Sequence, residues 1–145
     1  MPVASRPAFA VAYGGPDGEL LPWSWAAERL ARAHNYWVAT EGPHASPVWA
    51  LWRDGAILFS CSPSSRKART IARDPHVVVH LESGAEVVIV EGRAERMKAD
   101  TSVLDEYERK YSFRAEAENW FRVEPKRVLA WTEESYPKNA TRFDF

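Results

Sequence analysis

The chain has 145 residues, of which 46% are hydrophobic and 27% charged, so we expect one globular domain with a sizeable core. Its net charge of −1 gives no overall attraction to nucleic acid or to an anionic membrane, and the single cysteine, Cys61, excludes an intramolecular disulfide. No apolar run is long enough to span a membrane, and no leader pattern opens the chain. We therefore expect a cytoplasmic protein that binds neither nucleic acid nor membrane.

The first part of the chain predicts an arm followed by a helix. Residues 1–22 contain several prolines and the run Gly-Gly-Pro-Asp-Gly at 14–18, which predicts an irregular arm lying on a single domain over residues 23–145. Ser24 can cap a helix over about 24–35, where apolar residues recur at helical spacing.

Strand and turn patterns follow. We expect strands over 36–40, 46–52 and 56–61, a turn at 41–43, and a hairpin turn at 53–55 that contains Asp-Gly. The segment 46–52 is apolar on both faces, which predicts one central, fully covered strand paired with 56–61.

The second half repeats this alternation. Asp74-Pro75 is expected to end a helix over 62–73. Later elements are expected as strands over 76–81 and 86–96, a helix from Asp100 or Thr101 to about Tyr111, a strand near 121–131 with a turn at Glu124-Pro125, and an irregular tail. About six antiparallel strands with two to four helices predict a mainly β fold, a closed or nearly closed small β-barrel.

Positive charge gathers at the start of the helix predicted over 62–73, directly after a strand. Ser62 and Pro63 form a typical helix start, which places Arg66 and Lys67 in the first turn. Cations there are disfavoured by about 0.3–1 kcal/mol each. A bound anion, phosphate above all, would make the positions of these two cations favourable. A solvated basic helix face is the alternative, and the segment alone leaves both open.

The paired strand would bring Pro47, Val48 and Trp49 near the same end of the sheet. Pro47 has no N–H, which leaves a break in the ladder where a ligand ring can approach the backbone. Core packing is the alternative for Trp49, and it is favoured for Trp52.

Acid–base and metal chemistry have little support. The four histidines form no helical pair at metal-ligand spacing, so we expect no metal site. No Gly-x-Ser-x-Gly motif is present, and Ser64 or Ser65 beside Arg and Lys suits an anion ligand better than a nucleophile. We expect no catalytic side chain and a cofactor site suited to hydride or electron transfer by a bound redox ring.

The order of several motifs carries a resemblance. They are Tyr36-Trp37-Val38-Ala39-Thr40, Pro47-Val48-Trp49, Ser65-Arg66-Lys67-Ala68-Arg69, and the run from Asp74 to Leu81, followed by 87–92 and 140–143. This ordered set, over about residues 24–145, resembles the split-barrel flavin-binding family. It is most similar to the pyridoxamine 5′-phosphate oxidase-like proteins of actinobacteria, which include the flavin/deazaflavin oxidoreductases.

The resemblance implies a split β-barrel of the FMN-binding-protein type, a homodimer with two cofactor sites at its interface, and coenzyme F-420 or FMN as cofactor. Ser65, Arg66 and Lys67 match the segment that holds the cofactor phosphate, and Ser60 and Ser62 flank it. Pro47, Val48 and Trp49 match the strand that lies against the ring. Trp120, Arg142 or Phe143 would reach the partner's cofactor.

Some features depart from the family pattern. The hairpin at 41–44 is shorter, the ending Arg142-Phe143-Asp144-Phe145 has Phe where the group commonly has Trp, and no pattern matches the pyridoxal substrate residues. The expected function is an oxidoreductase that transfers hydride between the ring and a small organic substrate. Two alternatives stay open, a non-catalytic flavin- or deazaflavin-binding carrier and a degenerate member kept as a structural partner.

Overall fold

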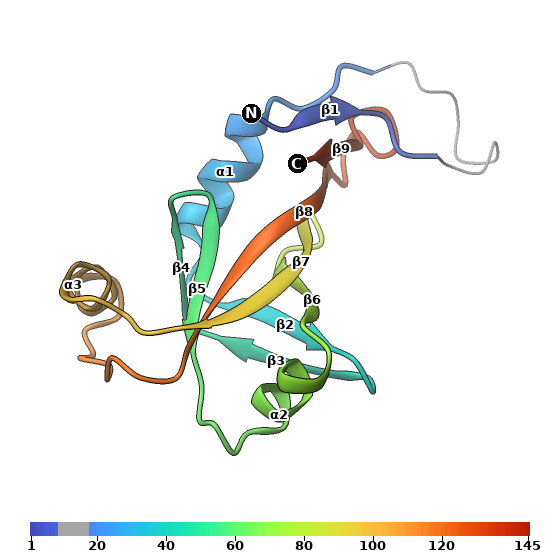
Figure 1. Cartoon of the computed structure of the whole chain (residues 1–145). Helices are drawn as coiled ribbons and strands as arrows, with labels where there is room; N and C mark the ends of the chain where they lie inside the picture. Colours follow the sequence, from blue (N-terminus) through green and yellow to red (C-terminus); the bar gives the residue numbers. More distant parts are fainter. Residues whose placement is uncertain (9–17) are drawn as a thin grey trace.

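A computed structural model describes residues 1–8 and 18–145 of the chain (Figure 1). The described residues form nine strands and three α-helices. In chain order these are β1 (Val3–Ser5), α1 (Trp23–Arg32), β2 (Tyr36–Thr40), β3 (His44–Val48), β4 (Ala50–Arg53), β5 (Ala56–Ser60), α2 (Arg66–Arg73), β6 (His76–Leu81), β7 (Glu86–Met97), α3 (Thr101–Tyr111), β8 (Trp120–Thr132) and β9 (Thr141–Asp144).

All strand pairs are antiparallel, and the barrel closes where the chain passes from β3 into β4. Strands lie in the order β1-β9-β8-β7-β6-β2-β3, and β5 pairs with both β4 and β8. Since one residue, Trp49, separates β3 from β4, the chain there joins the β2 side of the sheet to the β5 side. The mainly β barrel expected from the sequence is confirmed.

The single strand predicted over 46–52 is wrong. β3 pairs with β2, whereas β4 pairs with β5, so the apolar residues belong to two strands with different partners. Nor is β3 fully covered, because it lies at the end of the sheet order and Ala45 and Pro47 are exposed. A proline fits such an edge strand because its missing N–H removes no ladder bond from the interior of the sheet.

The hairpin turn between β4 and β5 is confirmed. Asp54 and Gly55 both have positive φ, 51° and 74°, as a two-residue turn of type I′ requires. β5 then ends at Ser60, one residue earlier than predicted.

The chain ends are more regular than predicted. Residues 141–144 form β9, which pairs with both β8 and β1, so the irregular tail is wrong and the arm contains a strand. Three-residue and four-residue strands have too little alternation to be recognised locally, and their long-range partners define them. The Gly-rich run 14–18 lies outside the described residues except for Gly18, and the boundary between 22 and 23 stays a prediction.

Helix α1 begins at Trp23 with Pro22 as its N-cap residue, so Ser24 lies inside the helix and does not cap it. A proline suits the N-terminal end of a helix because its fixed φ needs no adjustment there and its missing N–H would have no intrahelical partner.

The turn predicted at Glu124-Pro125 is also wrong, because β8 runs through it. Pro125 lies opposite Gly92, where the register between β7 and β8 shifts. A Cβ at position 92 would lie 2.4 Å from the Glu124 carbonyl oxygen, so glycine is required for this close approach.

Two apolar clusters support the barrel. The first fills its interior and includes Tyr36, Phe59 and Phe121. The second lies between the β4–β5 hairpin and α3, the helix inserted between β7 and β8 (Figure 1). The predicted cap of α3 is confirmed, since the Asp100 carboxylate accepts the Val103 N–H at 2.9 Å.

Candidate functional site

An open groove of about 570 Å³ lies where the chain crosses from β3 to β4. We call it the Trp49 groove; it is lined by Asn35, Pro47, Val48, Trp49, Ser60, Cys61, Ser62, Ser65, Lys67 and Tyr107. Four parts of the chain meet there: the loop between α1 and β2, the junction of β3 and β4, the segment from the end of β5 into the start of α2, and helix α3. The groove therefore exists only in the closed barrel.

The structure brings most of the predicted site residues to this groove. Those that line it are Pro47, Val48, Trp49, Ser60, Ser62, Ser65 and Lys67. Arg66 is the exception. Cofactor binding by these residues stays a prediction.

Helix α2 begins at Arg66, not at Ser62 as predicted. The Ser62 hydroxyl is engaged by Ser64, accepting its N–H at 3.3 Å, while the Ser65 N–H donates to the Ser62 carbonyl at 3.0 Å. Residues 62–65 thus form a turn, and β5 is not continuous with the helix. Ser65 is the N-cap, since its hydroxyl accepts the Ala68 N–H at 3.2 Å.

This start leaves two backbone N–H groups without an intrahelical acceptor. The first backbone bond of the helix runs from the Arg69 N–H to the Ser65 carbonyl, and the Ser65 hydroxyl takes the Ala68 N–H. The N–H groups of Arg66 and Lys67 precede both bonds, at the positive end of the helix dipole.

Arg66 and Lys67 lie on different sides of α2, because successive helical residues point about 100° apart. Lys67 lines the Trp49 groove. Arg66 donates from Nη2 to the Gly42 carbonyl at 2.8 Å and lines a separate depression with Arg69 and Arg73. The side-chain positions therefore do not favour the prediction that Arg66 and Lys67 together bind one phosphate.

Trp49 is a surface residue of the groove. Its side chain is 40% exposed and stacks on Tyr111, with ring centroids 4.8 Å apart and planes 6° apart. Core packing, the alternative raised for Trp49, is excluded. For Trp52 it is confirmed, since this residue packs against the barrel core and meets Trp23 edge-on.

Sequence reasoning missed Asn35, Cys61 and Tyr107, which also line the groove. Tyr107 and Tyr111 are four residues apart on α3, and their rings are in contact, with centroids 4.9 Å apart. That aromatic pair at i,i+4 was a visible signal. Its direction toward the β3–β4 break comes from the packing of α3 and had no local signal.

The chain resembles known proteins both in sequence and in fold. The sequence profile of the pyridoxamine 5′-phosphate oxidase family matches residues 26–132. This chain belongs to that family. No curated protein matches it individually.

Solved structures share the split-barrel fold of this family member. A conserved hypothetical protein of Mycobacterium tuberculosis is 21% identical, covering 78% of this chain and 86% of its own, with a TM-score of 0.67. An F-420 reductase is 18% identical over 70% of this chain and 93% of its own, with a TM-score of 0.58. An FAD-binding protein of Mycobacterium smegmatis is 17% identical, covering 87% and 98%, with a TM-score of 0.57.

In this member of the oxidase family, two of the residues that the resemblance directs at a partner's cofactor are buried within their own chain. Trp120 and Phe143 lie in the two apolar clusters. Arg142 is partly exposed and holds the Asp144 carboxylate, with Nε 2.9 Å from Oδ2.

Lys110, at the end of α3, is a half-buried cation behind the groove. Its Nζ donates to the Tyr36 hydroxyl at 2.9 Å and to the Ala50 carbonyl at 3.0 Å. Burial lowers the pKa of Lys110 to about 8, although Glu106 opposes the shift. Burial also raises the pKa of Tyr111 to about 12 and that of Tyr36 further.

This lysine predicts a pH dependence of stability. Between pH 8 and its ordinary pKa of 10.5, Lys110 is protonated in the unfolded chain and largely neutral in the native state. The unfolded state then binds more protons, so unfolding free energy should rise with pH from about 8 until the buried tyrosines reverse the trend above about pH 10. Urea unfolding across this range should show a steeper rise in the parent than in Lys110→Met. Lys98→Met, at an exposed lysine, should keep the parental slope, and a parental slope in Lys110→Met would contradict the assignment.

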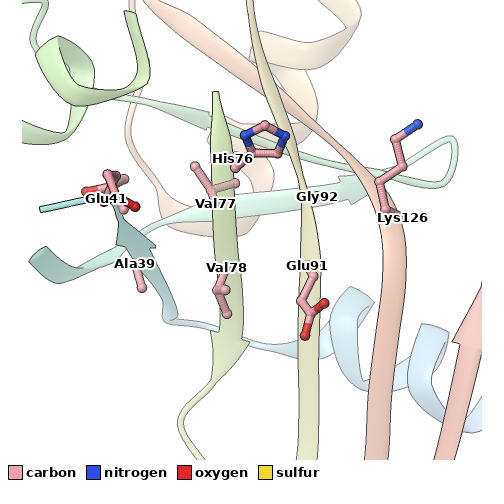
Figure 2. Close-up of a pocket in the computed structure, with 9 residues that line it drawn as sticks. Ala39, Glu41, His76, Val77, Val78, Glu91, Gly92 and Lys126 are labelled. Carbon is pink, nitrogen blue, oxygen red and sulfur yellow. The ribbon is translucent and has the colours of Figure 1, made fainter. Parts of the chain in front are cut away.

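A second depression, of about 470 Å³, lies on the outer face of the sheet. Figure 2 shows Ala39, Val78 and Glu91 on successive strands, with His76 farther along the strand of Val78 and Lys126 on the strand beyond Glu91. Apolar residues continue across this face, where Trp37 stacks on His80 with their planes 2° apart. The depression is separate from the Trp49 groove and shares none of its lining residues.

Within residues 1–8 and 18–145, no three His, Cys, Asp or Glu side chains are grouped to hold a metal ion. No helix in the same two ranges combines the length and apolar character that crossing a membrane demands.

Proposed function

We propose that this chain is a flavin-type oxidoreductase that binds a phosphorylated flavin or deazaflavin, FMN or coenzyme F-420, in the Trp49 groove. It would transfer hydride to or from a small organic substrate. One observation carries the proposal: a cation, serine hydroxyls and a helix start lie in the same groove as an exposed, stacked indole. A phosphorylated ring needs a cationic, hydrogen-bonding surface for its phosphate and a flat aromatic surface for its ring.

The phosphate end of the groove fits an anion. Lys67 forms no ion pair with an acidic side chain among the described residues. Ser62 and Ser65 line the same groove as Lys67, and Ser65 is the N-cap of α2. Charge-assisted bonds of this kind bind phosphate at many helix starts.

The ring end fits a flat heterocycle. One face of the Trp49 indole rests on Tyr111, and the side chain remains 40% exposed, which leaves room for a ligand ring. Pro47 and Val48 offer the backbone of an edge strand beside it. The volume of about 570 Å³ lies within the range of small-molecule sites.

A bound flavin or deazaflavin would itself supply the hydride chemistry. The chain would hold the phosphate at Lys67, Ser62 and Ser65 and orient the ring against Trp49. The names of two structural neighbours, an F-420 reductase and an FAD-binding protein, support a cofactor of this class.

A non-catalytic carrier of the same cofactor is the second candidate. Among the residues that the structure describes, those lining the groove include no His, Asp or Glu, so they offer a substrate no conventional acid–base pair. Binding without turnover would follow if the ring were covered on both sides.

We also propose that the protein is a homodimer. Trp37, His80, Ile89 and Leu129 form one row across β2, β6, β7 and β8, and all are only half-buried. A second copy covering this row would remove apolar surface from water. Sedimentation analysis should then give twice the chain mass.

A titration tests the cofactor proposal. Purified protein should quench the fluorescence of FMN or F-420 on binding, with FAD as a third ligand. The reduced complex is then mixed with a panel of electron acceptors. Saturable binding with turnover supports the oxidoreductase, and saturable binding without turnover supports the carrier. No binding of any of the three ligands would overturn both.

A further inference from the structure

Two side chains of helix α3 form hydrogen bonds with the backbone at the junction of β3 and β4. At Trp49 the chain leaves β2 and joins β5, so backbone groups on one side of Ala50 lose a strand partner. Two consecutive side chains of α3 take their place. The Tyr111 hydroxyl accepts the Ala50 N–H at 3.0 Å, and Lys110 Nζ donates to the Ala50 carbonyl at 3.0 Å. Buried backbone groups require such partners.

Tyr111 also contacts both the segment before β2 and the junction of β3 and β4. Its hydroxyl can donate to the carbonyl of His34, 2.8 Å away, or to that of Ala50, 2.9 Å away. His34 directly precedes Asn35, a groove residue. The Tyr111 ring stacks on Trp49, while His34 meets the edge of the same indole at 5.9 Å. One side chain thus contacts the backbone next to Trp49 and the indole itself.

Lys110 makes further contacts with the rings of Tyr36 and Tyr111. Its ammonium lies over the rings of Tyr36 and Tyr111, 4.9 and 5.1 Å from their centroids. It also bonds the Tyr36 hydroxyl, which in turn donates to the Leu30 carbonyl. Half-burying a lysine is unfavourable unless its donors are satisfied, and here both bonded acceptors belong to the barrel wall.

We propose that Lys110 and Tyr111 are positioning residues for the Trp49 groove. They fix the β3–β4 break, and with it the plane of the Trp49 indole against which a flat ring would stack. This inference rests on the proposed function for its ligand, since neither residue lines the groove. Their effect on binding would pass through Trp49 and the Ala50 backbone.

Two variants separate positioning from simple stability. Tyr111→Phe keeps the stacked ring and removes the hydroxyl, and Lys110→Met keeps the stem and removes the ammonium. Leu104→Ala is the matched control. It removes a buried side chain from the same helix and from the apolar cluster that includes Tyr111, and it leaves the hydrogen bonds of Tyr111 and Lys110 to Ala50 in place. All are compared well below their melting temperatures.

The first readout is the position of Trp49. Protein labelled with 5-fluorotryptophan gives a ¹⁹F resonance for each Trp, and Trp49→Phe assigns the one of interest. Tyr111→Phe and Lys110→Met should shift or broaden the Trp49 resonance, whereas Leu104→Ala should leave it in place. The second readout is FMN affinity, which should fall roughly three- to tenfold in the first two variants and stay unchanged in the control.

The outcomes distinguish the two proposals. If the parent binds FMN and Tyr111→Phe keeps both its affinity and the parental Trp49 resonance, the positioning role is overturned. An equal loss of affinity in Leu104→Ala would also overturn it, because stability alone would then explain the effect. If the parent binds no flavin or deazaflavin, the proposed function fails, and the Trp49 resonance still decides the positioning role.

Discussion

The Lys67→Ala variant is expected to bind FMN roughly 10- to 100-fold more weakly than the parent protein, because it loses a charge-assisted bond to the phosphate. Lys67 lines the groove beside Ser62 and Ser65, and no acidic side chain among the described residues pairs with it. Fluorescence titration at fixed ionic strength measures the change. Riboflavin, which has no phosphate, should lose little affinity in the same variant.

Arg66→Ala is the matched control for this result. It removes a neighbouring cation of the same helical turn whose guanidinium bonds the Gly42 carbonyl on the other side of α2. We expect a loss of FMN affinity of about twofold or less, arising from the more distant charge. A loss in Arg66→Ala equal to that in Lys67→Ala, or equal losses for FMN and riboflavin, would refute the phosphate assignment.

Trp120→Ala is expected to lower the free energy of unfolding by about 3–5 kcal/mol. The side chain is fully buried at the start of β8, and its indole N–H donates to the Glu116 carbonyl at 2.7 Å. Its ring meets Tyr107 edge-on at 5.2 Å. The variant leaves a cavity beneath α3 and an unpaired carbonyl, both of which destabilise the native state.

Urea unfolding at one protein concentration measures this change, since association would make stability depend on concentration. Trp49→Ala is the control. It removes the same kind of side chain from an exposed position and should cost less than about 1 kcal/mol. Similar losses in the two variants would contradict the assignment of Trp120 to the core and Trp49 to the groove.

The local elements were readable where a local cause defines them. Asp54-Gly55 defined a hairpin turn through backbone torsions that glycine and aspartate tolerate. Asp100 marked the start of α3 through its own cap bond. Asp74-Pro75 ended α2 at Arg73, because the residue before a proline is biased away from the helical conformation.

Errors arose where two local signals compete or where a distant partner decides. Ser62 and Ser65 are both good caps, and the bonds from Ser64 to Ser62 leave the cap position to Ser65. The segment 46–52 had one apolar pattern but two partners, which only the closure of the barrel separates.

The sequence by itself determined the barrel class, the family, and most of the residues that line the groove, because turn chemistry, caps and motif order are encoded in neighbouring residues. The tertiary structure decided which way those residues point. It placed Arg66 and Lys67 on different sides of α2, in separate depressions, and exposed Trp49 over Tyr111. It also placed Lys110 and Tyr111 against Ala50, a contact across about sixty residues that arises from packing and has no pattern in the local sequence.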